Sequence, residues 1–216
     1  HMKAQIQEKI GQGFDCVKLK IGALDFKEEL SLIKDIRAIY GADQLMIRVD
    51  ANGAFKPSEA LSRLKSLADL EIHSIEQPIA AGNHDALYEL CARTPLPIAL
   101  DEELIGVVEK KKKVDLLDNI APQYLILKPS LLGGFKACEE WISLAEERSI
   151  DWWVTSALES NIGLNAIAQW TFSLNVNRHQ GLGTGGLFTN NFSCPLEVRQ
   201  GHLTFNSNHK WETPFI

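Results

Sequence analysis

Short apolar segments recur along the chain, and most of them end in a charged or polar residue. Five such segments end, at successive intervals of 30, 26, 25 and 27 residues, in Lys20, Asp50, Glu76, Asp101 and Lys128. Two further segments, at 152–156 and 179–182, continue the same spacing. Apolar runs of this length predict buried strands of a parallel sheet.

Helical patterns separate these segments. Asp25 is a predicted N-cap for the first long pattern, and Pro57 begins the next. Further patterns of helical spacing lie at about 137–145 and 164–174. Strand–helix alternation at this period predicts an α/β fold, either a (β/α) barrel or a doubly wound open sheet.

The two faces of the predicted strands distinguish these folds. Side chains alternate across a strand, so Ile47 and Val49 share an apolar face while Arg48 and Asp50 share the other. An open sheet covered by helices on both sides would be apolar on both faces. A charged residue at the carboxyl end of each strand indicates instead a barrel with its active site at the mouth.

The count of strands bears on domain organisation. We count seven strands to residue 182, where a closed barrel needs eight, so we expect the chain to be the C-terminal part of a longer protein. His1 and Met2 are expected to derive from cloning, and residues 3–192 to form the barrel. Residues 193–216 form a tail with a predicted hairpin at 196–205, for which the chain offers no evident partner.

Composition narrows the function classes. The 216 residues are 45% hydrophobic and carry a formal net charge of −6, and no apolar run has the length of a membrane span. The only basic run, 110–113, lacks interleaved aromatic residues and is interpreted as a solvated helix face, so neither nucleic acid nor membrane is an expected partner. Four widely spaced cysteines without a CxxC motif predict a reduced, cytoplasmic protein.

Three carboxylates end consecutive strands. Asp50, Glu76 and Asp101 therefore converge on one side of the mouth, where they repel one another. A hard divalent cation with oxygen ligands relieves that repulsion, and the absence of His and Cys argues against zinc. We predict a Mg²⁺ site, which Mn²⁺ could also fill; a structural salt bridge is the alternative for any single one of these acids.

Lysines approach the same place from two sides. Lys18 and Lys20 share a face about 7 Å apart along a strand, and at an effective dielectric of about 20 their ammonium groups repel by about 2.4 kcal/mol. One of the pair is therefore expected to titrate close enough to neutrality to act as a base. Lys128 lies across the mouth. The set suits removal of an acidic α-proton from a small-molecule carboxylate and stabilisation of the resulting enediolate.

Five motifs in register resemble the enolase superfamily, in its muconate-lactonizing subgroup. The motifs are Lys18-Leu19-Lys20, Asp50-Ala51-Asn52, Glu76-Gln77-Pro78, Asp101-Glu102 and Leu127-Lys128-Pro129. The resemblance covers about residues 5–190 and implies a (β/α)7β-type modified TIM barrel. It also implies that an N-terminal capping domain and the first barrel strand lie outside this chain, and that the tail packs on that domain.

The resemblance also implies roles for these residues. Asp50, Glu76 and Asp101 would be the Mg²⁺ ligands. Lys20 would be the general base, and Lys128 the lysine on the opposite face of the substrate. Lys18 would contact the substrate carboxylate, with Asn52 close to the metal site.

Within the subgroup, the loops after the last strands are most similar to the o-succinylbenzoate synthase family of menaquinone biosynthesis. That likeness implies dehydration of a succinyl-hydroxycyclohexadiene carboxylate and adds Gly133, Ser156 and Glu159 as expected substrate contacts, with helix capping as an equal account of Ser156 and Glu159. Other racemases, epimerases or cycloisomerases of the superfamily remain alternatives. So does a truncated barrel that folds without turnover and associates with a second copy through its open edges.

Overall fold

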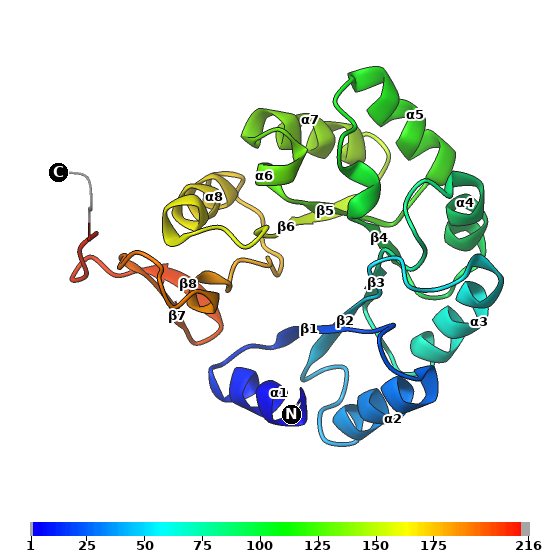
Figure 1. Ribbon diagram of the computed structural model, residues 1–216, viewed down its shortest axis with the longest axis horizontal. Coiled ribbons are helices and arrows are strands. Elements are labelled where there is room, and N and C mark those ends of the chain that lie inside the picture. Colours follow the sequence, from blue (N-terminus) through cyan, green and yellow to red (C-terminus); the bar gives the residue numbers. More distant parts are fainter. Residues whose placement is uncertain (1, 213–216) are drawn as a thin grey trace.

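The computed structural model describes residues 2–212 and places the predicted strands in a curled, wholly parallel sheet in sequence order. Figure 1 shows this half-barrel with its helices on the outer side. The strands are β1 (Cys16–Lys20), β2 (Met46–Asp50), β3 (Ser74–Glu76), β4 (Ile98–Leu100), β5 (Tyr124–Leu127) and β6 (Asp151–Val154). The α/β barrel-type fold predicted from the strand spacing is confirmed.

Helices follow the strands in turn. They are α1 (Met2–Gly11), α2 (Phe26–Arg37), α3 (Pro57–Ala68), α4 (His84–Arg93), α5 (Lys110–Ile120), α6 (Pro129–Leu132), α7 (Phe135–Glu146) and α8 (Asn161–Ser173), with short 3₁₀ turns η1 (Glu102–Leu104) and η2 (Gly185–Leu187). Asp25 caps α2 as predicted, since its carboxylate accepts a hydrogen bond from the Lys27 amide. Pro57 is the first residue of α3, also as predicted.

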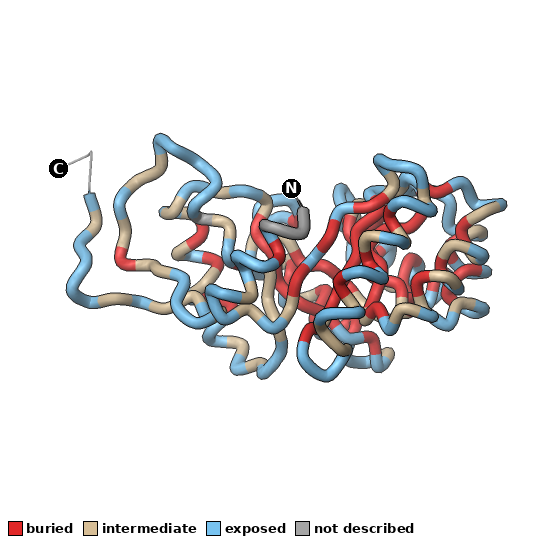
Figure 2. Tube along the Cα trace, turned by 90° about the horizontal axis from the view of Figure 1, so that it is seen from below, coloured by how far each residue is buried: buried red, intermediate tan, exposed pale blue. Residues whose placement is uncertain are grey.

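The core lies between the sheet and the helices. Ile47, Val49, Ile75 and Leu100 on the helix-facing side are completely buried. Figure 2 shows the buried residues concentrated in the half-barrel, whereas the residues of the C-terminal hairpin are of intermediate burial or exposed. No helix within residues 2–212 is both long and apolar enough to cross a bilayer.

The seventh predicted strand is reduced to a single parallel bridge between Thr155 and Gly181. The Gly181 amide donates to the Val154 carbonyl at 2.8 Å. Gly181 therefore occupies the position of the next strand, but the pairing stays an isolated bridge. Next to this bridge, the His179 ring lies 2.8 Å from the Asp15 carboxylate, which precedes β1. The two ends of the half-barrel therefore meet at its amino-terminal rim.

The predicted tail hairpin is present as β7 (Leu196–Arg199) and β8 (His202–Phe205), and it does have a partner within the chain. The Gly201 amide in its turn donates to the Gln12 carbonyl at 2.9 Å, just after α1. A Cβ on Gly201 would lie 2.4 Å from the Gly13 carbonyl oxygen, and its φ is 73°. Glycine is thus required where the hairpin meets the α1 loop.

The interpretation of residues 110–113 as a solvated face is wrong at one position. Lys113 is 1% exposed, and its ammonium donates to Glu140 at 2.7 Å and to the Ala137 carbonyl at 3.3 Å. It also lies 5.2 Å from the centre of the Trp141 ring. The helix α5 buries this lysine against α7, and the salt bridge satisfies its charge. All four cysteines are unpaired, as predicted.

Candidate active site

The strand register brings the charged strand ends together. In the strand register, Lys20 of β1 lies opposite Asp50 of β2, and Asp50 lies opposite Glu76 of β3. Parallel strands end at one edge, so these side chains share the barrel mouth. Asp50, Glu76 and Asp101 are each 2% exposed or less.

Lys18 lies between two of the carboxylates. Its ammonium nitrogen is 2.9 Å from Asp50 Oδ2 and 2.9 Å from Glu76 Oε2. Lys20 reaches the same Asp50 oxygen at 2.6 Å and is the more exposed of the two lysines. Both lysines of the predicted pair therefore contact the predicted acidic cluster.

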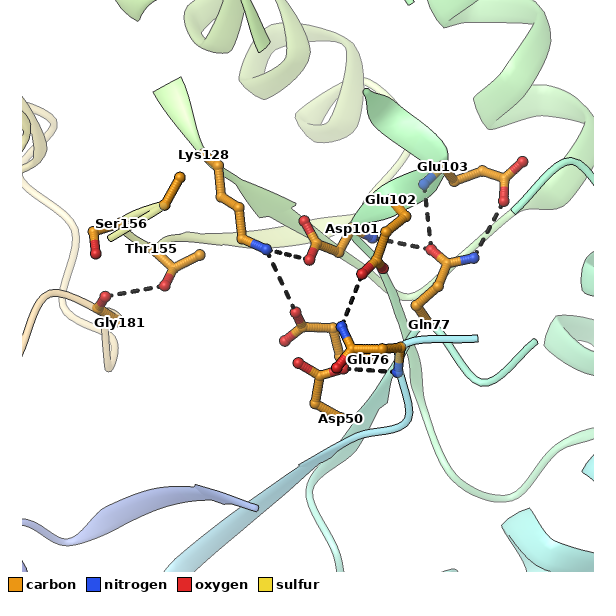
Figure 3. A network of polar contacts seen from close by, with 12 residues as sticks. Asp50, Glu76, Gln77, Asp101, Glu102, Glu103, Lys128, Thr155, Ser156 and Gly181 are labelled. Carbon is orange, nitrogen blue, oxygen red and sulfur yellow. Dashed lines mark hydrogen bonds and ion pairs between the residues drawn. The ribbon is translucent and has the colours of Figure 1, made fainter. Parts of the chain in front are cut away.

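Lys128 reaches the cluster from the carboxyl end of β5, and Figure 3 shows it directed at Asp101 and Glu76. Its ammonium donates to Asp101 Oδ2 and lies 4.0 Å from Glu76 Oε1. Glu76 thus lies between the two lysine positions, and the structure brings together the five residues predicted to hold the metal or to perform the chemistry, with Lys18 beside them.

Asn52 is also at the mouth. Its backbone is left-handed, with φ 42°, and its backbone N–H donates to Asp50 Oδ1 at 3.0 Å. Its side-chain oxygen accepts from Lys20 at 2.5 Å, while its side-chain nitrogen donates to Glu102 at 2.8 Å. Asn52 therefore orients Lys20, in keeping with its predicted place beside the metal site.

Burial shapes the electrostatics of the carboxylates. Burial raises the pKa of Glu76 to about 8; Lys18 opposes this rise, while repulsion from Asp50 and Asp101 adds to it. Burial also acts to raise the pKa of Asp50, but the ammonium groups of Lys18 and Lys20 outweigh it and lower that pKa. Glu76 is consequently the carboxylate that most needs a further cation.

The expected repulsion between the two lysines does not dominate at Lys18. Burial acts to lower the pKa of its ammonium, but the neighbouring carboxylates of Glu76 and Asp50 outweigh burial and raise it. The two carboxylates therefore favour the ammonium form of Lys18.

The oxygen atoms of the three carboxylates are possible ligands for a divalent cation. As placed, no three His, Cys, Asp or Glu side chains of residues 2–212 form a group that could hold a metal ion, because lysine ammonium groups contact the three carboxylates. Yet Glu76 Oε1 is buried without a hydrogen-bond partner. An unpartnered buried carboxylate oxygen among three oxygen donors fits Mg²⁺ chemically.

Among the remaining predicted substrate contacts, Ser156 and Glu159 form hydrogen bonds to residues outside this cluster. Ser156 bonds the Thr184 hydroxyl. Glu159 accepts from Ser130 at 2.6 Å and from the Ala157 amide at 3.0 Å, which is a local loop contact. Gly133 ends α6 with a left-handed φ of 94°. Their roles as substrate contacts remain predictions.

Sequence reasoning missed three polar residues next to the cluster, namely Gln77, Glu102 and Glu103, which Figure 3 shows beside Glu76 and Asp101. Glu103 and Gln77 are buried, whereas Glu102 is half-buried. Gln77 and Glu102 directly follow Glu76 and Asp101 in the motifs, a signal that could have identified them, whereas Glu103 lies outside the motifs.

Comparisons with known proteins agree with this geometry. A family model described as enolase C-terminal domain-like matches residues 1–209. The chain is 54% identical over 202 residues to the o-succinylbenzoate synthase of Desulfotalea psychrophila, covering 94% of this chain and 55% of that protein. It is 31% identical over 174 residues to the N-succinyl-L-Arg/Lys racemase of Bacillus cereus, covering 80% and 46%.

Among solved structures, the crystal structure of MenC from D. psychrophila superposes with a TM-score of 0.89 at 53% identity. The superposition covers 94% of this chain and 56% of that one. The chain thus spans about half the length of the curated relatives it matches.

Proposed function

The chain belongs to the enolase C-terminal domain-like family, and we propose that it is the barrel part of an o-succinylbenzoate synthase of menaquinone biosynthesis. The reaction would be the dehydration of a succinyl-hydroxycyclohexadiene carboxylate to o-succinylbenzoate. The observation that carries the proposal is the pair of lysine positions, Lys20 and Lys128, on opposite sides of the buried carboxylates. The 54% identity to a synthase supports the choice within the family.

Asp50, Glu76 and Asp101 would hold Mg²⁺, with Mn²⁺ as a substitute. Their oxygens are the ligand type these hard cations prefer, and Glu76 has one buried oxygen without a hydrogen bond. A bound cation would supply positive charge beside the substrate carboxylate. For this to occur, Lys18 and Lys128 would have to release the carboxylate oxygens that they now contact.

The lysines would divide the proton chemistry. Lys20, as a neutral amine, would take the α-proton of the substrate and return it to the departing β-hydroxyl, so that water leaves and the ring becomes aromatic. Lys128, as an ammonium, would stabilise the enediolate charge from the opposite face without transferring a proton. Lys18, once released from Asp50 and Glu76, would pair as an ammonium with the substrate carboxylate.

A second function is favoured by one observation. Two lysines on opposite sides of one site could also remove and return an α-proton on opposite faces, and a racemase of N-succinyl amino acids is among the relatives. The loop at 181–184 carries no acid to hold a substrate ammonium, which argues against dipeptide epimerisation.

Four unpaired cysteines support a cytoplasmic location.

The test is an assay of this chain with Mg²⁺ on the succinyl-hydroxycyclohexadiene carboxylate, followed by the ultraviolet absorbance of the aromatic product. Product formation that disappears in Lys20→Ala would support the synthase. If the chain alone is inactive, a fusion to the remaining part of the D. psychrophila synthase gives the decisive assay. Exchange of the α-hydrogen of an N-succinyl amino acid in ²H₂O without dehydration would favour the racemase instead.

A further inference from the structure

Gln77 is a buried polar residue to which the proposed chemistry gives no role. It follows Glu76 directly at the end of β3 and is 1% exposed. Its backbone is left-handed, with φ 39°, a conformation uncommon for residues other than glycine. A buried amide in such a backbone position calls for a physical reason.

The side-chain amide of Gln77 uses its full hydrogen-bonding capacity. Its oxygen accepts from the backbone amides of Asp101 and Glu103, each at 3.3 Å. Its nitrogen donates to the Ile79 carbonyl at 3.1 Å and to Glu103 Oε2 at 3.2 Å. An amide has two acceptor positions and two donors, so every one is used; Figure 3 marks the bonds to Asp101 and Glu103.

Glu103 fixes which way this amide faces. Its side chain is 2% exposed and accepts from Gln77 through one oxygen. The other oxygen accepts from the Gly82 amide at 2.9 Å and from the His84 ring at 2.7 Å. Because a carboxylate only accepts, Gln77 must present its nitrogen to Glu103 and its oxygen to the Asp101 amide.

This arrangement joins two of the predicted metal ligands. Gln77 is the chain neighbour of Glu76, and its side chain holds the backbone of Asp101. The Gln77 backbone is fixed as well, since its amide donates to the Ala99 carbonyl at 2.9 Å and its carbonyl accepts from Gly53 at 2.7 Å. The Gln77 side chain therefore fixes the distance between the Asp101 backbone nitrogen and the end of β3.

We propose that Gln77, oriented by Glu103, is a positioning residue that fixes the spacing of the Glu76 and Asp101 carboxylates and thereby sets the affinity of the site for a divalent cation. The inference rests on the proposed function, because it requires the site to bind such a cation. Gln77 and Glu103 contact neither the lysines nor the three carboxylates through their side chains, so they act only through the backbone that carries the ligands.

The test compares two glutamines that bond opposite ends of one strand. Gln77→Met keeps the side-chain length and removes all four hydrogen bonds. Gln123→Met is the matched control, because the Gln123 side chain accepts from the Ile98 amide at 2.9 Å at the start of β4, away from the mouth. Mn²⁺ binding is titrated by electron paramagnetic resonance, and the melting temperature without metal is measured for each protein.

We expect Gln77→Met to weaken Mn²⁺ binding at least tenfold, and Gln123→Met to change it less than twofold even where both variants melt at a lower temperature. Glu103→Gln is a milder second variant. Its amide cannot accept through both ends, so it loses either Gln77 or the Gly82 and His84 bonds, and we expect a loss of three- to tenfold.

The outcomes separate the inference from the proposed function. Absence of Mn²⁺ binding by the unchanged chain would overturn both. Normal binding by the unchanged chain, with Gln77→Met within twofold of it, would overturn the inference alone. If Gln77→Met does not fold, Glu103→Gln decides: an affinity within twofold of the unchanged chain overturns the inference, and a loss of threefold or more supports it.

Discussion

The raised pKa of Glu76 predicts a strong coupling between protons and metal. Burial and the repulsion from Asp50 and Asp101 bring that pKa from the ordinary 4.5 to about 8, although Lys18 opposes the shift. The shift corresponds to a cost of about 5 kcal/mol for ionising Glu76 in the folded chain, as an upper bound. At pH 7 about one tenth of the folded molecules then carry an ionised Glu76.

Stability without metal and affinity for metal should change in opposite directions as the pH rises. Between pH 4.5 and 8 the folded chain holds a proton on Glu76 that the unfolded chain has lost, so stability without metal falls as the pH rises through this window. A divalent cation needs the ionised form. Its affinity should therefore rise about tenfold per pH unit up to pH 8 and level off above it.

Two measurements check this reasoning. Mn²⁺ affinity is determined by calorimetry at pH 6.5, 7.5 and 8.5, and the melting temperature without metal at pH 5 to 8. Glu76→Gln should bind Mn²⁺ weakly and lack the pH slope, and the stability advantage of the unchanged chain over it should shrink by about 10 °C across that range. Glu59→Gln, which removes a half-exposed carboxylate on α3 that pairs with Arg63 far from the mouth, is the control. Equal affinities at pH 6.5 and 8.5 would refute the reasoning.

Further substitutions test other parts of the structure. Lys20→Ala should reduce turnover at least a thousandfold while Mn²⁺ still binds within a few-fold, and retained turnover in the synthase assay would exclude Lys20 as the base. Gly201→Ala should lower stability by about 2 kcal/mol or more, because its Cβ meets a carbonyl, whereas Gly106→Ala has open space at a similar φ and should cost only about 1 kcal/mol in thermal unfolding. Lys113→Met should cost about 2 kcal/mol through its lost charged hydrogen bonds, against less than about 0.5 for the neighbouring Lys111→Met in urea unfolding.

The parts of the fold that were predictable from sequence depend on local patterns. Apolar runs with a charged end located β1 to β5, and Asp25 and Pro57 located the starts of α2 and α3. The register of parallel strands then required the charged ends to meet. For that reason, the acidic cluster and both lysine positions could be predicted before their contacts were known.

The errors have non-local causes. Nothing in the run at 110–113 distinguishes Lys113 from its neighbours; its burial is favourable because of Glu140, Ala137 and Trp141, which belong to a different helix, α7. The hairpin contact depends on two glycines far apart in sequence, Gly13 and Gly201. The motif marks the position of Gln77, but its hydrogen bond to the Asp101 amide depends on β4 ending beside it.

The contacts of Lys20 also indicate how the proposed base and the proposed metal site depend on each other. Asp50 Oδ2 accepts from both Lys18 and Lys20, so a single carboxylate oxygen stabilises two ammonium groups. If Asp50 ligates a divalent cation, that oxygen would face a third positive charge, and its contact with Lys20 would weaken. Asn52 would still hold the Lys20 nitrogen in place, because its side-chain oxygen accepts a hydrogen bond from that nitrogen. The same ligand would then help bind the metal and release the amine that removes the substrate proton, so loss of metal binding should also remove the base.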